Sequence, residues 1–145
     1  METGIVPEIH ENTDTLGIYK VKSVVIATGG RPRYLDIKGK ELAITSDDIF
    51  LNTTAPGKTL IVGGGYVAME IAGFLTSFGY NTSLMVRSEV LRSFDRDMVK
   101  RVTDDLIQRK VNINYKSVPT ELKQEGKEIL VTYCKLTKNS TKGCI

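Results

Sequence analysis

Short apolar runs that end at glycines alternate along this chain with segments of helical period. Residues 23–27 and 59–62 are compact β-branched runs followed by glycines, which predicts two buried strands. From residue 66 the period changes, and apolar residues spaced four, three, one and three apart predict a helix that stops at Gly79. Its apolar face comprises Val67, Ile71, Phe74, Leu75 and Phe78. Residues 83–86 then predict a third strand.

The second half of the chain continues this alternation. Residues 95–110 predict a helix, residues 111–115 and 128–133 predict strands, and residues 124–127 have the composition of a turn. The apolar face of that helix comprises Met98, Val99, Val102, Leu106 and Ile107. Strands that alternate with helices indicate an α/β fold, so we expect a parallel sheet flanked by helices.

The remaining segments predict less regular structure. Residues 1–22 are polar and predict loose chain with an edge strand near residues 17–21, and residues 135–145 predict a frayed tail. Residues 31–58 have the composition of a linker, with a helix start at residues 45–48.

Composition and charge exclude several classes of protein. The chain has 145 residues, 41% of them hydrophobic and 26% charged, which suits one globular domain. No apolar run approaches the roughly 18 residues that cross a bilayer, and no secretory signal pattern is present. Cys134 and Cys144 form neither a metal motif nor a redox motif, so we expect a cytoplasmic protein without a metal site or a membrane partner. A net charge of +3 with no basic stripe argues against a nucleic-acid partner.

A glycine motif follows the strand at residues 59–62 and opens the next helix. Gly63-x-Gly65-x-x-Ala68 has the spacing of a dinucleotide-binding turn. The first glycine permits a tight turn, the second lets a pyrophosphate approach the backbone, and the small third residue lets helix and strand pack closely. The amides at the helix N-terminus then attract the phosphates. The alternative is a glycine-rich turn with no ligand.

The end of the following strand indicates which dinucleotide is bound. A carboxylate there accepts from the ribose 2′-hydroxyl of NAD, whereas an arginine suits the 2′-phosphate of NADP. Arg87 stands 22 positions after Gly65, Arg92 follows it, and the nearest acid is Glu89. The pattern favours NADPH, unless these arginines are ordinary surface charges.

These segments together resemble the NADPH-binding part of the flavoprotein disulfide reductases. The resemblance rests on GGGYVAMEIAGFL at residues 63–75, MVRSEVLRSFD at residues 85–95, and VIATGGRP at residues 25–32. TSDDIF at residues 45–50 and FDRDM at residues 94–98 are more similar to large thioredoxin reductases, whereas VLRSFD at residues 90–95 leans toward glutathione reductase.

The resemblance implies a hydride relay from NADPH to FAD to a disulfide. It places Gly63, Gly65, Val67 and Ala68 at the nucleotide, and Arg87 and Arg92 at its 2′-phosphate. It likens Tyr66 to a mobile aromatic over the flavin and Glu70 to a carboxylate near the nicotinamide. Thr28 and Gly29 would belong to the FAD side. The cofactor contacts are therefore expected at Gly63, Gly65, Tyr66, Val67, Ala68, Glu70, Arg87, Arg92, Thr28 and Gly29.

Several parts of that family have no counterpart in this sequence. The FAD-binding G-x-G-x-x-G, the Cys-x-x-x-x-Cys redox pair and the catalytic His-Glu pair are missing, and the single histidine, His10, matches nothing catalytic. We therefore expect residues 1–57 to be a remnant of an FAD-domain segment plus linker. Residues 58–145 would be a C-terminally truncated, incomplete Rossmann-like NADPH-binding domain. No catalytic residue is assigned, and this chain alone is not expected to hold FAD or to turn over.

Without a last parallel strand, one sheet edge would be unpaired, and we expect residues 24–27 to cover it.

Three functions remain open at this stage. The first is the NADPH-binding part of a thioredoxin-reductase-like enzyme, with thioredoxin or a similar disulfide as substrate and a homodimer in the full-length form. A fragment of glutathione reductase or thioredoxin-glutathione reductase is the near alternative. The second is a non-enzymatic nucleotide-binding or interaction module, which an exposed apolar patch would favour. The third, a nucleic-acid binder, has only the mild positive charge behind it.

Overall fold

The computed structural model describes residues 19–137 and divides into two units, residues 1–31 and residues 32–145. In the first unit, residues 19–31 form neither helix nor strand. Val24, Val25 and Ile26 are 74%, 88% and 84% exposed. The buried strand predicted at residues 23–27 is therefore wrong, and the prediction that residues 24–27 cover a sheet edge is wrong with it. An apolar run becomes a strand only where a neighbour supplies hydrogen-bond partners, which the run itself does not encode.

Other predictions for the ends of the chain fall largely outside the described residues. The loose segment before residue 19 and the tail after residue 137 are among these. Of the predicted edge strand at residues 17–21, residues 19–21 are described and form no strand.

The second unit contains a parallel sheet in the order β1-β2-β3. Its strands are β1 (Thr59–Val62), β2 (Thr82–Val86) and β3 (Asn112–Tyr115). Ile61, Leu84 and Ile113 lie in one row across the three strands. β2 is the central strand of this sheet, and its residues 84–86 are all buried.

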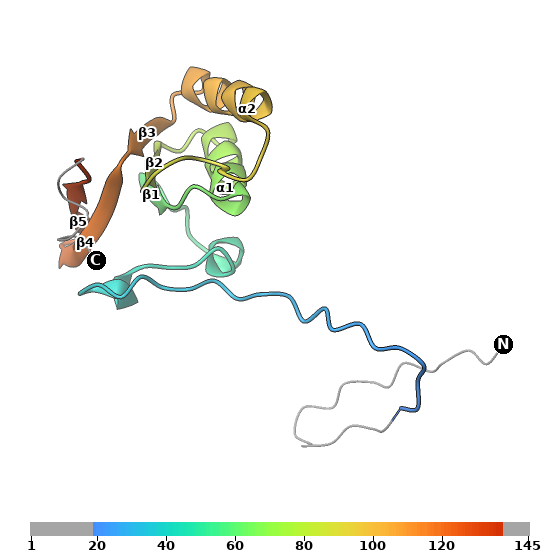
Figure 1. The fold of residues 1–145 in the computed structure, drawn as a ribbon. Helices are drawn as coiled ribbons and strands as arrows, with labels where there is room; N and C mark the ends of the chain where they lie inside the picture. Colours follow the sequence, from blue (N-terminus) through green and yellow to red (C-terminus); the bar gives the residue numbers. More distant parts are fainter. Residues whose placement is uncertain (1–18, 138–145) are drawn as a thin grey trace. The chain divides into compact units, whose positions relative to one another are not determined.

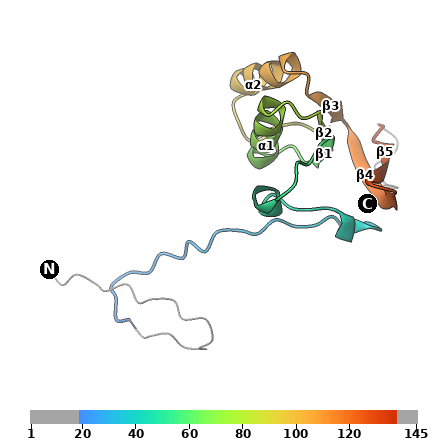
Figure 2. The ribbon, with the colours of Figure 1, turned by 180° about the vertical axis from the view of Figure 1, so that it is seen from behind.

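Two helices lie on the same face of this sheet (Figures 1 and 2). They are α1 (Tyr66–Ser77) and α2 (Arg96–Gln108), and the predicted bounds of both are confirmed to within a few residues. Met69 and Ala72 of α1 and Val99 and Leu106 of α2 share one core with alternate residues of β2. None of the helices between residues 19 and 137 combines the length and the hydrophobicity needed to cross a bilayer.

An antiparallel hairpin follows the sheet. It joins β4 (Ser117–Glu125) to β5 (Glu128–Lys135) around a turn in which Gly126 has a φ of 61°. The sequence predicts β5 and the turn but not β4. β4 is not predicted because Pro119 and the charged residues after it are unfavourable in strands. The pairing register shifts between Pro119 and Glu121.

The segment before β1 contacts both the hairpin and α1. It contains two short 3-10 helices, η1 (Lys40–Leu42) and η2 (Asp48–Leu51), and η2 fulfils the helix start predicted at residues 45–48. The Lys38 carbonyl accepts from the Leu122 amide of β4 at 2.9 Å. The ring of Phe50 stacks on Phe74 of α1 with centroids 5.6 Å apart. These contacts hold the segment against the domain that carries the glycine motif.

Candidate functional site

The glycine motif lies at the carboxyl end of β1, where the chain turns sharply from the strand into helix α1. Gly63 has a φ of 148°, a conformation that side-chain-bearing residues rarely adopt. Its amide donates to the Met85 carbonyl of β2 at 3.0 Å. A Cβ built on Gly63 would lie 3.5 Å from the Cβ of Ala68, an ordinary contact distance, so the constraint at Gly63 is its backbone conformation. The predicted reason for Gly63, a tight turn, therefore matches the geometry.

Gly64, the variable position of the motif, is constrained by its neighbours. A Cβ there would lie 2.8 Å from the Glu89 carbonyl oxygen and 2.9 Å from a methyl of Val86. The Gly64 carbonyl accepts from the Leu91 amide at 2.6 Å. The glycine motif and the loop after β2 are thus packed backbone to backbone, a requirement that no local pattern reveals.

Gly65 differs from Gly63 and Gly64 because the space beside its Cα is open. It is the N-cap residue of α1 and is exposed, and a Cβ built on it would meet no atom within 4 Å. The first amides of an α-helix have no partner within the helix, and no side chain caps α1. The first turn of α1 also contains no acidic residue. The N-terminus of α1 therefore presents unsatisfied donors and a partial positive charge beside an open backbone surface.

The N-terminus of α2 has the opposite arrangement. The Asp95 carboxylate accepts from the amides of Asp97 and Met98 at 3.0 and 3.1 Å, and Asp97 adds a negative charge in the first turn. At the start of α2, the Asp95 side chain therefore satisfies two of the free backbone amides. The start of α1 has no such side-chain cap.

Two arginines lie near this open helix start. Arg87 follows β2 directly, Arg92 lies further along the same loop, and both are exposed. Among residues 19–137 neither side chain has a hydrogen bond or an ion pair. Glu89 lies between them and pairs with Arg96 at 3.3 Å. The geometry thus brings Gly63 and Gly65 together with residues 87–95, called the arginine loop, at the carboxyl edge of the sheet, where ligands bind in open α/β sheets.

Four predicted residues lie along α1. Val67 and Ala68 are half-buried, whereas Tyr66 is 59% exposed. Tyr66 and Glu70 line one part of a groove of about 710 Å³ between α1 and α2. Much of the rest of the groove is apolar, with Phe78, Phe94, Met98 and Val102 all substantially exposed. Exposed apolar surfaces of this kind commonly mark places where another segment or molecule binds.

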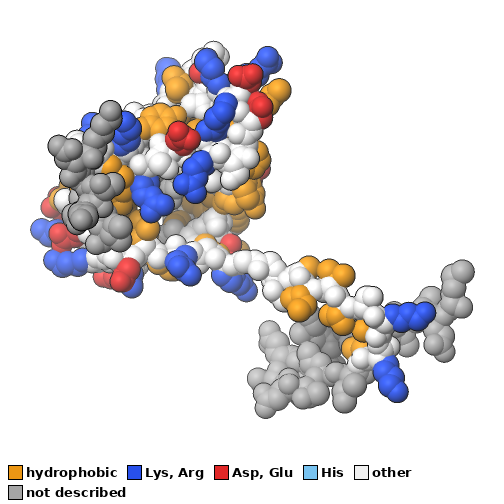
Figure 3. Space-filling view, in the orientation of Figure 1, with side chains coloured by type: hydrophobic (Ala, Val, Ile, Leu, Met, Phe, Trp, Pro, Cys, Tyr) orange, Lys and Arg blue, Asp and Glu red, His pale blue; other side chains and the backbone are white. Residues whose placement is uncertain are grey.

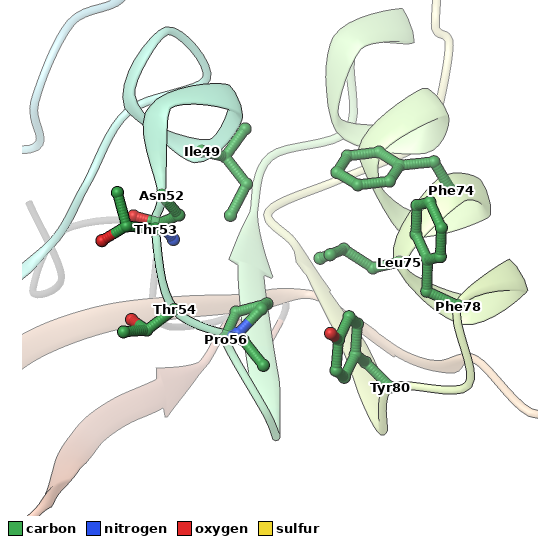
Figure 4. Close-up of a pocket in the computed structure, with 10 residues that line it drawn as sticks. Ile49, Asn52, Thr53, Thr54, Pro56, Phe74, Leu75, Phe78 and Tyr80 are labelled. Atoms are coloured by element: carbon green, nitrogen blue, oxygen red, sulfur yellow. The ribbon is translucent and has the colours of Figure 1, made fainter.

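A second, smaller hollow of about 290 Å³ lies between the segment before β1 and α1 (Figure 4). Its walls are Ile49 and residues 52–56 on one side and Phe74, Leu75, Phe78 and Tyr80 on the other. It includes no residue of the glycine motif, so we assign it no part in the dinucleotide site.

The two predicted residues on the FAD side belong to the other unit. Thr28 and Gly29 are exposed in irregular chain, and Gly29 has a φ of 71°. His10 lies outside the described residues. Among residues 19–137, no group of three or more histidine, cysteine or acidic side chains could hold a metal ion. On the face seen in Figure 3, Lys and Arg side chains are interspersed with acidic and apolar ones rather than gathered in one patch.

Comparison with known families identifies the chain. The family described as pyridine nucleotide-disulphide oxidoreductase matches residues 3–143. The chain belongs to this family. The match extends over both units, and the family is one of oxidoreductases, as the motifs predict.

Two curated relatives are thioredoxin reductases. Thioredoxin reductase SEP1 of Emiliania huxleyi is 59% identical over 76 residues, which are 52% of this chain and 15% of that protein. The mitochondrial thioredoxin reductase 2 of Drosophila melanogaster is 46% identical over 112 residues, or 76% of this chain and 22% of that protein. The chain thus spans less than a quarter of the length of either relative.

Solved structures show the same fold. The HOCl-induced flavoprotein disulfide reductase RclA of Escherichia coli has a TM-score of 0.67 and 22% identity, over 73% of this chain and 25% of its own. The water-forming NADH oxidase of Lactobacillus brevis, solved with NADH bound, has a TM-score of 0.61 and 16% identity, over 73% of this chain and 26% of its own. The predicted α/β class with a parallel sheet and flanking helices is confirmed.

Proposed function

We propose that this chain is the NADPH-binding part of an FAD-dependent pyridine nucleotide-disulphide oxidoreductase of the thioredoxin reductase type. The observation that carries the proposal is the N-terminus of α1 at Gly65. No side chain caps its backbone amides, and no atom fills the space beside the Gly65 Cα. A pyrophosphate is the anion that suits such a site in a strand-turn-helix unit. Gly63, Gly65, Val67 and Ala68 would hold it.

The preference for NADPH over NADH rests on Arg87 and Arg92. Both are exposed in the loop after β2, and their side chains have no partner among the described residues. A hydrogen bond to a charged group is worth about 1.5–3 kcal/mol, so two of them would favour the 2′-phosphate by about a hundredfold or more. The one nearby carboxylate, Glu89, is already paired.

The wider activity is hydride transfer from NADPH through FAD to thioredoxin or a similar disulfide. The two thioredoxin reductases support this substrate over glutathione, since they match 52% and 76% of the chain. Tyr66 would cover the flavin and Glu70 would face the nicotinamide, while residues 1–57, with Thr28 and Gly29, would belong to the FAD side. The FAD supplies the hydride acceptor when bound. Because the sequence has no FAD-binding G-x-G-x-x-G, no Cys-x-x-x-x-Cys redox pair and no catalytic His-Glu pair, this chain by itself is expected to bind nucleotide without turnover.

Titration calorimetry with NADP⁺ and, separately, NAD⁺ tests this proposal on the full chain and on R87A. We expect NADP⁺ to bind more tightly than NAD⁺, and R87A to weaken NADP⁺ binding about tenfold or more while leaving NAD⁺ little changed. R101A, which removes an exposed arginine of α2, is the matched control and is expected to bind like the unmodified chain. Equal affinities for the two nucleotides would contradict the role of the arginines.

A second candidate is an interaction module that pairs with a longer member of the same family. The groove between α1 and α2 favours it, because Phe94 and Met98 are 54% and 59% exposed on an apolar surface. Co-sedimentation with a purified thioredoxin reductase, lost in M98E, would support this function. Absence of any complex at micromolar concentrations would reject it.

A further inference from the structure

Arg96, the first residue of α2, makes three contacts to the loop that follows β2. Its Nη1 lies 3.3 Å from the Glu89 carboxylate. Its Nη2 donates to the carbonyls of Val90 at 3.1 Å and Leu91 at 2.9 Å. One guanidinium therefore binds three consecutive residues, which uses the fixed fork geometry of arginine.

The three arginines of this segment thus have different surroundings. Arg87 and Arg92 have no side-chain partner among residues 19–137, whereas both Nη atoms of Arg96 contact the protein. The loop that Arg96 holds is also tied to the glycine motif, since the Leu91 amide donates to the Gly64 carbonyl at 2.6 Å. Arg96 therefore acts on the arginine loop at a point already in contact with the proposed phosphate turn.

Glu89 makes this contact important for nucleotide choice. It lies two residues after Arg87, in the loop that follows β2, where a free carboxylate would repel a 2′-phosphate held by the two arginines. Left alone, its carboxylate would oppose Arg87 and Arg92. Paired with Arg96, it has its charge offset and its oxygen drawn to α2.

We propose that Arg96 is a specificity-determining residue, which keeps Glu89 away from the nucleotide and so permits binding of a 2′-phosphorylated dinucleotide. This inference rests on the proposed nucleotide site and adds the mechanism of its selectivity. Arg96 acts through Glu89 and the loop backbone and need not touch the ligand. It is thus a positioning residue.

Titration of NADP⁺ and NAD⁺ into four variants of the full chain tests this role. The variants are R96Q, E89Q, the double variant E89Q/R96Q, and R101Q, which removes an equal charge from α2 without breaking a described contact. The readout is the ratio of the two dissociation constants, because simple loosening of the loop would weaken both nucleotides together. Thermal unfolding of each variant reports whether the fold is kept.

We expect R96Q to lower the preference for NADP⁺ about fivefold, whereas E89Q and R101Q change it less than about twofold. The double variant E89Q/R96Q is expected to recover most of the preference, because the released carboxylate is gone. An unchanged ratio in R96Q, or a double variant no better than R96Q, would overturn this role for Arg96 while leaving the nucleotide site intact. If the unmodified chain shows no preference, the proposed NADPH function fails, and the role of Arg96 fails with it.

Discussion

At the scale of single residues, the three consecutive glycines are needed for three different physical reasons. Gly63 adopts a φ of 148°, Gly64 has no room for a Cβ beside Glu89 and Val86, and Gly65 has open space where a Cβ would stand. The first two requirements come from the protein itself. The fold places no such demand on Gly65, so under the proposed function its open surface serves the nucleotide.

Substitution at Gly65 should therefore affect binding and not stability. Its φ of −81° and ψ of 174° suit alanine, so G65A should unfold at the same or a slightly higher temperature, with a gain of up to about 1 kcal/mol. The added methyl should block approach of the pyrophosphate and weaken NADP⁺ binding about tenfold or more. Thermal unfolding and calorimetry measure the two effects separately.

G64A is the matched comparison for this prediction. Its Cβ would approach a backbone oxygen to 2.8 Å, so overpacking should destabilise the fold by about 1–3 kcal/mol. If G65A bound NADP⁺ as well as the unmodified chain, the phosphates would not lie against Gly65.

At the scale of elements, the helix starts differ in how their amides are satisfied. The N-terminus of α1 has no side-chain cap, and that of α2 is capped by Asp95. At η2, the Asp48 carboxylate accepts from both the amide and the hydroxyl of Thr45, each at 2.7 Å. Such local hydrogen bonds explain why the starts of α2 and η2 could be predicted from polar residues just before an apolar segment.

The contact at η2 predicts a dependence on pH. The Thr45 hydroxyl, followed by the Thr45 amide, lowers the pKa of the Asp48 carboxyl from its ordinary value. Because the folded pKa is the lower one, its stabilising effect is complete above the ordinary value, about 4, and is lost as pH falls through the folded pKa. Carbon-detected NMR titration of the Asp48 carboxyl should show this low pKa.

T45V provides the control for that titration. It removes the hydroxyl donor and keeps the amide, so the pKa of Asp48 should move part of the way back toward its ordinary value. An ordinary pKa in the unmodified chain would contradict the hydrogen bonds seen at η2.

At the scale of the whole molecule, the division between residues 31 and 32 separates irregular chain from packed structure. Residues 19–31 expose an apolar run, whereas residues 32–137 include the sheet, both α-helices and the hairpin. The polar residues that precede the exposed run include Lys20 and Lys22. Such chain lacks the hydrogen-bonded backbone that protects helices from proteases.

Limited proteolysis should therefore begin in the first unit. We expect trypsin to cut after Lys20 and Lys22 well before it cuts after Arg101, which is equally exposed but lies within α2. Mass spectrometry of a time course identifies the order of cleavage. Protection of Lys20 and Lys22 until α2 is cut would show that residues 19–31 are covered in solution.

The amino-acid sequence by itself determined the elements of the domain and the place of its turn. The bounds of β1, α1, β2 and α2 and the position of Gly63 and Gly65 at a strand end follow from local periodicity, because each depends on residues within a few positions of one another. The same local signals placed Arg87 at the end of β2.

Only the tertiary structure decided which side chains contact other parts of the protein and which remain exposed. Contacts across the fold show that Gly64 packs on the loop of Glu89, that Arg96 engages Glu89, and that the apolar residues 24–26 stay exposed. They also supplied β4, whose pairing with β5 outweighs its unfavourable composition. These features depend on partners that the chain brings together only on folding, so a reading along the sequence had no access to them.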